Sequence, residues 1–260
     1  MATSRSGRFR RHTTNAAVLA VSTVMVAGFG TVAHAGTAPT GSLLAAGAPA
    51  AAGLNLNAAD VQSGLLRQGA KGSQVKAIQQ RLIDLGYWLD GADGEFGPLT
   101  TQAVYAVQKA AGIERDGVVG PATRAALDKG VRPKASTSSG NVVEIDLARQ
   151  LLLVVSDGKV RRIFNTSTGS GKPYVSNGQK QVATTPKGRY PVFRAVDAWD
   201  PGPLGALYRP KYFNRGIAVH GYSSVPPYPA SHGCARVSIA AMDWLWANGS
   251  LKQHTPVVVR

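Results

Sequence analysis

The stretch SHGCARV, residues 231–237, contains Cys234, the only cysteine in a chain of 260 residues. A histidine, His220, ends an apolar run fourteen residues before this cysteine. A thiol becomes a nucleophile when an imidazole within hydrogen-bond reach takes its proton. Gly233 leaves the backbone uncovered, so the N–H groups of Gly233 and Cys234 can both point at one oxyanion. The stretch therefore predicts a thiol active site.

Two other interpretations of Cys234 stay open on the residues alone. A single cysteine is often a small buried apolar residue, and with His220 and His232 it could ligate a metal. Residues 1–35 have the pattern of an export signal, described below, and an unpaired thiol is unusual in an exported protein. No further cysteine or acidic cluster lies near residues 232–234. We therefore expect no metal and no organic cofactor. Arg236 stays charged at any working pH and is expected either to hold a substrate carboxylate or to tie down the loop.

The residues around this stretch have the pattern of strands. Apolar and polar residues alternate, or apolar residues run together, over five ranges: 143–147, 151–155, 190–193, 216–220 and 257–259. Asp157-Gly158 indicates a hairpin, and Pro191 favours a sheet edge. One helix is expected over 239–247, with Ser238 as its N-cap. Residues 141–260 are thus predicted to form a mostly-β domain with one short helix.

His220-Gly221 followed by SHGCAR resembles the active-site motif of the L,D-transpeptidase catalytic domain family. The TPKGRY segment at 185–190 and the STG segment at 167–169 also fit that family. The resemblance covers about 141–260 and implies a β-sandwich-like domain. The spacing from His220 to the SHGC motif is shorter than in many members, so the length of the lid loop, and with it the detail of substrate selection, stays open.

The resemblance also implies roles for the site residues. Cys234 would be the nucleophile, and His220 would accept and donate the proton. The Gly221 carbonyl would orient His220. The other site residues expected around this pair are Ser231, His232, Gly233 and Arg236, the last as the substrate-binding residue.

The family chemistry implies an activity and an inhibitor. Cys234 would form a thioester with a stem peptide of peptidoglycan, and an amine of a second stem would then form a 3–3 cross-link. Two alternatives are an L,D-carboxypeptidase, in which water takes the acyl group, and a catalytically silent wall-binding protein. Carbapenems are expected to acylate the same thiol.

Residues 64–129 have the pattern of three helices, over about 75–85, 98–111 and 121–127. Residues 93–104 repeat as 116–127, each copy an Asp-Gly turn, then Gly-Pro, then a helix. Residues 66–127 resemble the peptidoglycan-binding domain family 1, a three-helix module that would bind wall glycan and stem peptides. The alternative is a helical spacer that binds nothing.

The remaining segments are expected to export and connect these regions. Residues 1–35 contain four arginines, a moderately apolar run and Ala33-His34-Ala35, which is the pattern of a signal peptide; an uncleaved anchor is the alternative. Residues 36–63 and 130–140 are rich in small residues, proline or serine and are predicted to be a spacer and a linker. The linker implies that the helical module is tethered to the β-domain rather than fused with it.

The charge of the chain favours an anionic partner. The sequence has 29 Lys plus Arg and 14 Asp plus Glu, a formal net charge of +15. With an export signal, nucleic acid is excluded as a target, and the anionic polymers of a bacterial envelope are favoured. No apolar run is strong enough for a stable membrane span. We therefore expect a secreted, cell-wall-associated protein.

Overall fold

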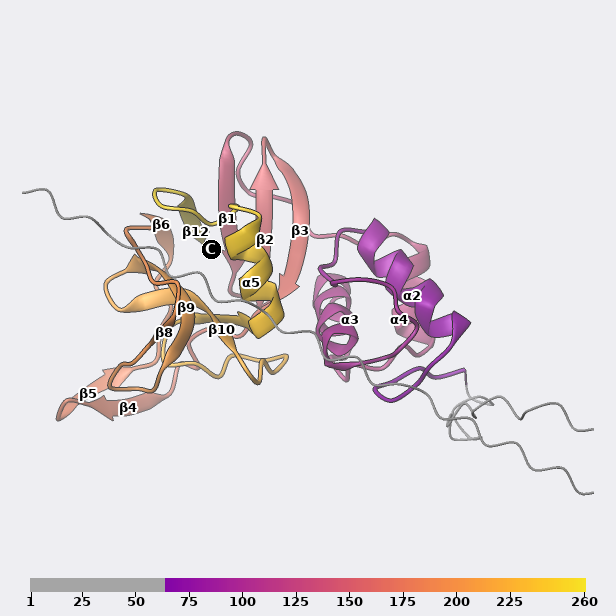
Figure 1. Ribbon diagram of the computed structural model, residues 1–260, viewed down its shortest axis with the longest axis horizontal. Helices are drawn as coiled ribbons and strands as arrows, with labels where there is room; N and C mark the ends of the chain where they lie inside the picture. Colours follow the sequence, from indigo (N-terminus) through magenta and orange to yellow (C-terminus); the bar gives the residue numbers. More distant parts are fainter. Residues whose placement is uncertain (1–63) are drawn as a thin grey trace, which may run out of the picture. The chain divides into compact units, whose positions relative to one another are not determined.

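The computed structural model describes residues 64–260, which form a helical module and a domain of two β-sheets (Figure 1). The predicted signal peptide, 1–35, and spacer, 36–63, lie outside the described residues. Within 64–260 no helix is both long and apolar enough to cross a membrane. The predicted fold class, a small helical module followed by a mostly-β domain, is confirmed.

The helical module contains α2 (Ser73–Asp84), α3 (Pro98–Ala111) and α4 (Pro121–Asp128) (Figure 1). Proline begins α3 and α4, where its missing N–H costs no helical hydrogen bond. α3 ends at Gly112, whose φ of 68° is the left-handed conformation that glycine adopts readily. The Gly-Pro starts and the glycine stop therefore place these helices where the sequence predicts them.

Two buried glutamines give the internal repeat its structural cause. The Gln79 side chain donates to the Asp93 carboxylate at 2.7 Å and accepts from the Gly94 N–H at 2.8 Å. Gln108 makes the same two contacts with the Asp116-Gly117 turn, at 2.6 and 3.0 Å. Each glutamine also donates to the threonine hydroxyl of the helix that follows its turn. The repeated DG–GP–T pattern thus encodes two copies of the same turn, each held by the side-chain amide of its own buried glutamine.

The first sheet of the β-domain has the order β3-β2-β1-β12-β6. Its strands are β1 (Asn141–Asp146), β2 (Leu151–Ser156), β3 (Lys159–Asn165), β6 (Gly188–Pro191) and β12 (Pro256–Val259). β1 is antiparallel to β2 and parallel to β12, with Ile145 opposite Val259. β6 is an edge strand, as Pro191 predicts, because proline cannot donate to a second neighbour.

The second sheet has the order β11-β10-β9-β7, and β8 also pairs with β9. Its strands are β7 (Arg194–Ala195), β8 (Trp199–Asp200), β9 (Leu207–Asn214), β10 (Ile217–Tyr222) and β11 (Ala235–Ser238). β4 (Pro173–Ser176) and β5 (Gln179–Val182) form a separate hairpin. α5 (Ile239–Ala247) follows β11, and its N-cap Ser238 accepts from the Ala241 N–H at 3.2 Å, as predicted.

The core of the sandwich lies between the two sheets and under α5. Its fully buried members include Val143, Ile145, Leu152, Val219, Ala235, Met242, Leu245 and Val257. The strand expected over 190–193 ends at Pro191. The Val192 N–H donates to Thr255 beside the first sheet, and the Phe193 N–H donates to Tyr212 on the second. The chain therefore crosses between the sheets where one longer strand was expected.

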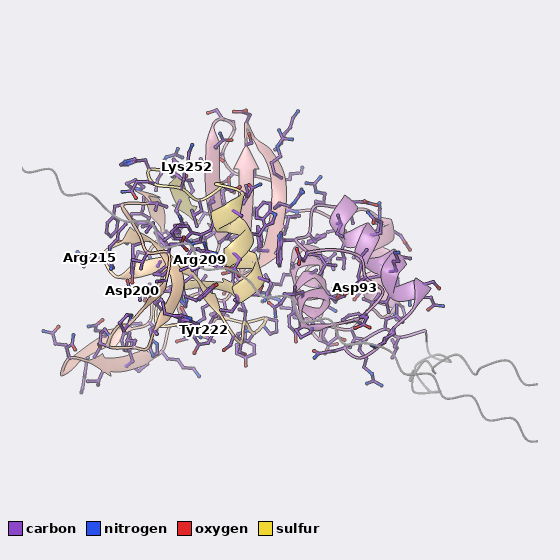
Figure 2. The ribbon with its side chains drawn as sticks, viewed as in Figure 1. Asp93, Asp200, Arg209, Arg215, Tyr222 and Lys252 are labelled. Atoms are coloured by element: carbon purple, nitrogen blue, oxygen red, sulfur yellow. The ribbon has the colours of Figure 1, made fainter. Side chains whose placement is uncertain are left out.

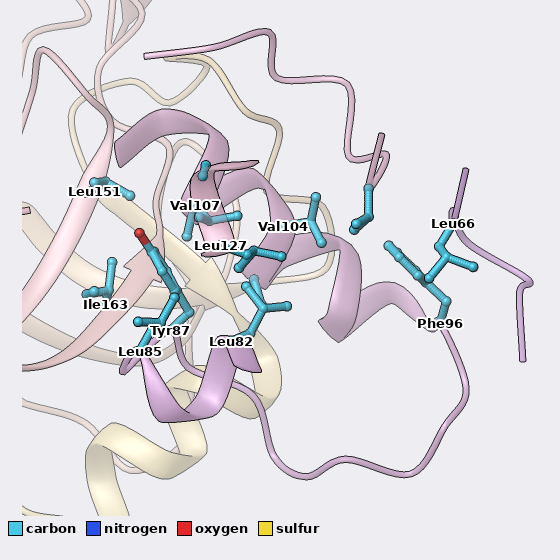
Figure 3. Close-up of a cluster of buried hydrophobic side chains, with 14 of the residues drawn as sticks. Leu66, Leu82, Leu85, Tyr87, Phe96, Val104, Val107, Leu127, Leu151 and Ile163 are labelled. Carbon is cyan, nitrogen blue, oxygen red and sulfur yellow. The ribbon is translucent and has the colours of Figure 1, made fainter. Parts of the chain in front are cut away.

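The first sheet also contributes to a second hydrophobic cluster, which it shares with the helical module (Figure 3). In β2, Leu151, Leu153 and Val155 belong to this cluster, whereas Leu152 and Val154 belong to the sandwich core. A strand buried on both faces reads as a continuous apolar run, which is the pattern of 151–155. The module's buried members include Leu82, Leu85, Tyr87, Val107 and Leu127. The expectation of a merely tethered module is therefore wrong, because β2 needs the module to cover it.

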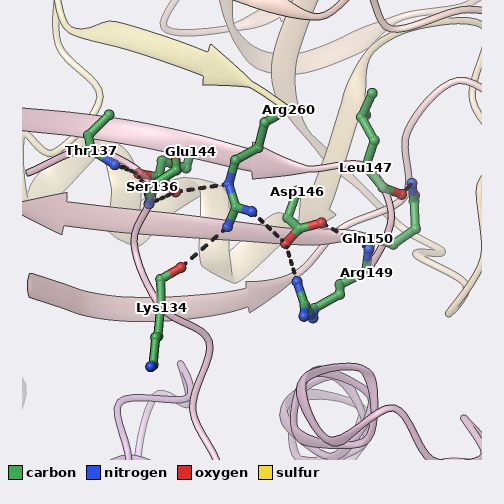
Figure 4. Close-up of polar contacts among 9 residues, drawn as sticks. All are labelled: Lys134, Ser136, Thr137, Glu144, Asp146, Leu147, Arg149, Gln150 and Arg260. Carbon is green, nitrogen blue, oxygen red and sulfur yellow. Dashed lines mark hydrogen bonds and ion pairs between the residues drawn. The ribbon is translucent and has the colours of Figure 1, made fainter. Parts of the chain in front are cut away.

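The connecting segment 130–140 is held by a buried carboxylate (Figure 4). Glu144 on β1 accepts from the Ser136 N–H at 2.9 Å, from the Thr137 N–H at 2.8 Å and from the Arg260 guanidinium at 3.1 Å. Burial acts to raise the pKa of Glu144, but the hydrogen bonds from Thr137 and Ser136 hold it below its usual range. The segment is therefore a fixed connection.

Replacing this carboxylate should destabilise the fold. We expect Glu144→Ala to lower the free energy of unfolding by about 3 kcal/mol, because it leaves two backbone N–H groups and the Thr137 hydroxyl without their acceptor and removes one of the two carboxylates that pair with Arg260. A urea titration measures the loss. The control is Glu95→Ala, which removes an exposed pair with Lys71 and should cost less than about 1 kcal/mol. Equal losses in the two variants would contradict this role of Glu144.

Candidate active site

Strands β10 and β11 bring His220 and Cys234 to one face of the second sheet. The two strands are parallel, with Val219 opposite Ala235 and His220 opposite Arg236. The first pair is buried in the sandwich core, so the second pair projects from the opposite face. Cys234 precedes Arg236 by two residues and has that same orientation. The strand register thus assembles a thiol, an imidazole and a guanidinium on one surface.

The Cys234 thiol is half-buried and has only weak partners. The Ala218 N–H donates to its Sγ at 3.4 Å, and the Gly216 carbonyl lies 3.8 Å from the same atom. Burial raises the pKa of the thiol, while the Ala218 N–H and the charge of Arg236 act to lower it. Among residues 64–260, no three His, Cys, Asp or Glu side chains gather in a way that could hold a metal ion. Because its pKa is raised and its contacts are weak, the Cys234 thiol is protonated at rest.

The His220 imidazole is only 1% exposed and has a fixed orientation. Its Nδ1 lies 2.9 Å from the Gly221 carbonyl, which can only accept, so Nδ1 carries the proton and Nε2 keeps a lone pair. Burial lowers the pKa of His220 to about 4, and the charge of Arg236 adds to the effect against the Gly221 contact. Only glycine fits at 221, because a Cβ would lie 2.7 Å from Tyr208 and 3.2 Å from Met242. His220 is thus neutral at pH 7.

Hydroxyl groups brace the turn that presents Cys234. The Ser231 hydroxyl donates to the Cys234 carbonyl at 2.6 Å and accepts from the Gly233 N–H at 3.0 Å. The Gly233 carbonyl accepts from the Thr185 hydroxyl at 2.6 Å. The Gly233 N–H was expected to face an oxyanion, but here Ser231 already occupies it. Of the two N–H groups expected to bind an oxyanion, the Cys234 N–H therefore stays a candidate.

Arg236 contacts the protein rather than a groove. Its Nη1 donates to the Ala230 carbonyl at 3.2 Å, and its guanidinium lies 4.1 Å from the centre of the Tyr222 ring. Its buried Nε has no hydrogen-bond partner among the described residues. Of the two roles expected for Arg236, loop attachment agrees with these contacts, and substrate binding stays a prediction. Its charge still acts on the site: it opposes the rise that burial causes in the pKa of Cys234, and it adds to the lowering of the pKa of His220.

A groove of about 1040 Å³ leads to Cys234, and we call it the main groove. Its lining includes Cys234, Gly233 and His232, together with residues of the β4–β5 hairpin. A second hollow of about 480 Å³, the side groove, lies beside it. Both are lined by His232 and Tyr174, whose ring centres are 4.7 Å apart. His232 is thus an exposed divider between the grooves, and neither groove is lined by the buried His220.

The charges along the main groove favour an anionic ligand. Asp200 is already neutralised, because it pairs with Arg194 at 3.0 Å and accepts from the Tyr212 hydroxyl at 2.8 Å. Arg215 lines the same groove and has no carboxylate partner in the described part of the chain (Figure 2). A ligand with a free carboxylate therefore finds an available guanidinium here.

Sequence reasoning missed the part that Thr185 plays. Its hydroxyl accepts from the Gly169 N–H at 2.9 Å and donates to the Gly233 carbonyl, which joins two of the motifs singled out in the sequence. A Cβ at residue 169 would lie 2.4 Å from the Ala183 carbonyl, so the close approach requires glycine. The TPKGRY motif contains Thr185, but sequence spacing does not show which atoms it reaches.

The comparisons with known proteins agree with this geometry. Residues 140–259 match the family model of the L,D-transpeptidase catalytic domain. A crystal structure of an L,D-transpeptidase from Xylanimonas cellulosilytica is 53% identical, with a TM-score of 0.73, and the match covers 75% of this chain and 97% of that one. The chain belongs to the L,D-transpeptidase family. Residues 71–127 of the chain also match the family model of a peptidoglycan binding domain.

Curated amidase and carboxypeptidase relatives match the chain in its helical region. The N-acetylmuramoyl-L-alanine amidase CwlL of Bacillus licheniformis is 46% identical over 95 residues, which are 35% of this chain and 26% of the relative. The zinc D-Ala-D-Ala carboxypeptidase of Streptomyces albus G is 40% identical over 93 residues, which are 33% of this chain and 36% of the relative. The chain thus spans about a quarter to a third of the length of these enzymes. The likeness to these two enzymes concerns the helical module.

Proposed function

We propose that this chain is an exported peptidoglycan L,D-transpeptidase that forms 3–3 cross-links through a thioester on Cys234. The observation that carries the proposal is the pairing of a groove-lining thiol with a neutral imidazole on the adjacent strand. The peptidoglycan binding module supports the anionic bacterial wall as the place of action, and so does the net charge of 29 − 4 − 14 = +11 that remains without the four arginines of the predicted signal peptide.

In the acylation step, His220 Nε2 takes the proton of the Cys234 thiol, and the sulfur attacks the carbonyl carbon of residue three of a stem tetrapeptide. The Cys234 N–H stabilises the oxyanion that forms. The C–N bond then breaks, and His220 returns the proton to the amine of the leaving D-alanine.

In the second step, the side-chain amine of a diamino acid on a neighbouring stem attacks the thioester carbon. His220 removes the amine proton, the C–S bond breaks, and the sulfur leaves as a thiolate that His220 reprotonates. The free Arg215 guanidinium fits a carboxylate of a stem peptide lying in the main groove. The alternative, L,D-carboxypeptidase action, differs only in that water attacks the same thioester.

Product analysis tests this proposal. Purified full-length protein is incubated with a disaccharide-tetrapeptide, and the products are separated and weighed. A cross-linked dimer with loss of one D-alanine supports the transpeptidase. A tripeptide without dimer would identify the carboxypeptidase, and unchanged substrate would leave a silent wall-binding protein.

The buried state of His220 predicts an unusual pH profile. Because burial lowers the pKa of this base to about 4, it keeps its lone pair well below pH 6.5. We therefore expect kcat/KM to stay level from neutral pH down to about pH 5 and to fall as the pH drops through about 4. Steady-state rates from pH 3.5 to 8 measure this. A fall centred near 6.5 would contradict a buried, neutral base.

The activated thiol also predicts acylation by carbapenems. A strained β-lactam carbonyl is an acyl donor for Cys234, and the adduct lasts if water is kept from it. Intact-protein mass spectrometry after carbapenem exposure should show one added drug mass. Because Cys234 is the only cysteine, Cys234→Ser and Cys234→Ala should show none. An equal adduct in the alanine variant would contradict the assignment of the nucleophile.

A further inference from the structure

A buried lysine of the helical module reaches into the β-domain. Lys109 on α3 is 1% exposed, and its ammonium donates to the Gln150 and Thr166 carbonyls, each at 2.9 Å, and to the Asn165 amide oxygen. Burial lowers the pKa of Lys109 to about 6, whereas these three contacts match the three donors of the charged ammonium group and favour it. An apolar side chain would fill this interface as well as a lysine does. The contacts of Lys109 therefore indicate that it fixes the position of the segment 165–166.

The segment that Lys109 holds runs directly beside the site. Thr166 donates through its hydroxyl to the Arg236 carbonyl at 2.7 Å. The next residue, Ser167, exchanges two backbone hydrogen bonds with Arg236, at 3.0 and 3.2 Å. The segment that Lys109 holds is therefore bonded directly to Arg236 of β11, the strand that begins after Cys234.

The module makes a second set of contacts, with residues 223–230, which we call the connecting loop because it joins His220 on β10 to the SHGC turn. Gln102 on α3 donates to the Val225 carbonyl at 3.1 Å, and Arg115 donates to the Pro227 carbonyl at 3.1 Å. Asn165 donates to Gln102 at 2.6 Å and to the same Val225 carbonyl. The helical module thus holds the middle of the connecting loop from outside.

The connecting loop in turn holds the charge of Arg236. Its last residue, Ala230, accepts from the Arg236 guanidinium at 3.2 Å and donates its N–H to the Thr168 carbonyl at 3.0 Å. The charge of this guanidinium acts to lower the pKa values of Cys234 and His220. A continuous chain of hydrogen bonds therefore leads from the module, through the loop and the 165–168 segment, to the charge beside the thiol.

We propose that Gln102, Lys109 and Arg115 of the helical module are positioning residues for the thiol site, through the connecting loop and Arg236. The module is then a structural part of the active site as well as a wall-binding unit. The inference rests on the proposed function only for its effect on turnover. An error of about 1 Å at reacting groups can cost about 100-fold in rate, so a scaffold of this kind has a measurable consequence.

A purely structural role would predict something different. If these contacts only stabilised the fold, their loss would lower the melting temperature and leave the thiol unchanged in the protein that stays folded. If the loop merely loosened, Cys234 would become more exposed and its pKa would fall toward the ordinary value. Displacement of Arg236 instead removes a positive charge near the sulfur, so the thiol pKa should rise. The thiol pKa of Cys234 thus stays unchanged for a purely structural role, falls for a loosened loop, and rises if Arg236 is displaced.

The experiment measures how fast iodoacetamide alkylates the single cysteine of the full-length chain from pH 6 to 10, at a temperature where circular dichroism shows each variant to be folded. The test variants are Arg115→Ala and Gln102→Ala, with Lys109→Met added if it folds. The matched controls are Arg81→Ala and Gln80→Ala, whose side chains bond only within the module, to Leu127 and Asp84. Arg115→Lys keeps one donor and should partly restore the wild-type behaviour.

We expect the midpoint of alkylation to move upward in the test variants, which slows alkylation at pH 7 by about threefold or more, and to stay in place in the controls. On soluble tetrapeptide, kcat should fall by about tenfold with KM nearly unchanged. An unmoved or lowered midpoint in both folded test variants would overturn the inference. If the wild-type chain shows no turnover but the midpoints rise as described, the proposed function fails and the positioning role stands.

Discussion

Cys234→Ala should reduce turnover of a stem tetrapeptide by at least about 10⁴-fold, because no other thiol can form the acyl-enzyme. The variant should still fold. The side chain is half-buried, its partners are a 3.4 Å N–H contact and a 3.8 Å contact, and alanine occupies nearly the same volume. We expect the melting temperature to stay within a few degrees of the wild-type value.

The measurement is product formation with the disaccharide-tetrapeptide, followed by mass analysis. Cys234→Ser is the companion variant, since it keeps a polar group at the same place but is a weaker nucleophile beside a neutral imidazole. A Cys234→Ala protein that keeps substantial turnover would contradict the mechanism. A protein that loses its fold would instead show that the thiol has a structural role.

His220→Ala should lower turnover by at least about 100-fold, because the thiol then has no base to take its proton. The thiol pKa is already raised by burial, so few molecules hold a thiolate at neutral pH without help. The loss should appear in kcat more than in KM, since His220 does not line either groove. Steady-state kinetics at pH 7 measure both constants.

His232→Ala is the matched control, because it removes the other imidazole of the site. His232 is exposed and packs on Tyr174 between the two grooves, so its loss should affect KM and leave most of kcat. Full activity in His220→Ala together with a large loss of kcat in His232→Ala would make His232 the base. That result would contradict the role that the His220–Gly221 contact supports.

The parts of this structure that were predicted depend on local signals. α3 lies at Pro98–Ala111 as expected, because Gly-Pro begins it and Gly112 ends it. The N-cap at Ser238 located α5 in the same way. One local signal was overlooked: Asn177-Gly178 is the turn of the β4–β5 hairpin, with φ of 51° and 74°, and an Asn-Gly pair between short strands is typical of such turns.

The parts that were not predicted depend on contacts between distant residues. The run 151–155 was identified as a strand, but one sequence does not say that a helical module covers its second face. Lys109 has no signal at all, since its three acceptors come from residues 41 to 57 positions away. The free Gly233 N–H was expected from its lack of a side chain, and only the folded turn places Ser231 on it.

The most direct test of the thioester is to trap it. The full-length protein is mixed with a tetrapeptide whose diamino-acid side chain is acetylated, so that no amine can serve as acceptor, and the intact protein is weighed. We predict a mass increase equal to the tetrapeptide minus D-alanine, and peptide mapping that places it on Cys234. Turnover of this peptide with an adduct on any other residue, or with equal product from Cys234→Ala, would contradict the account.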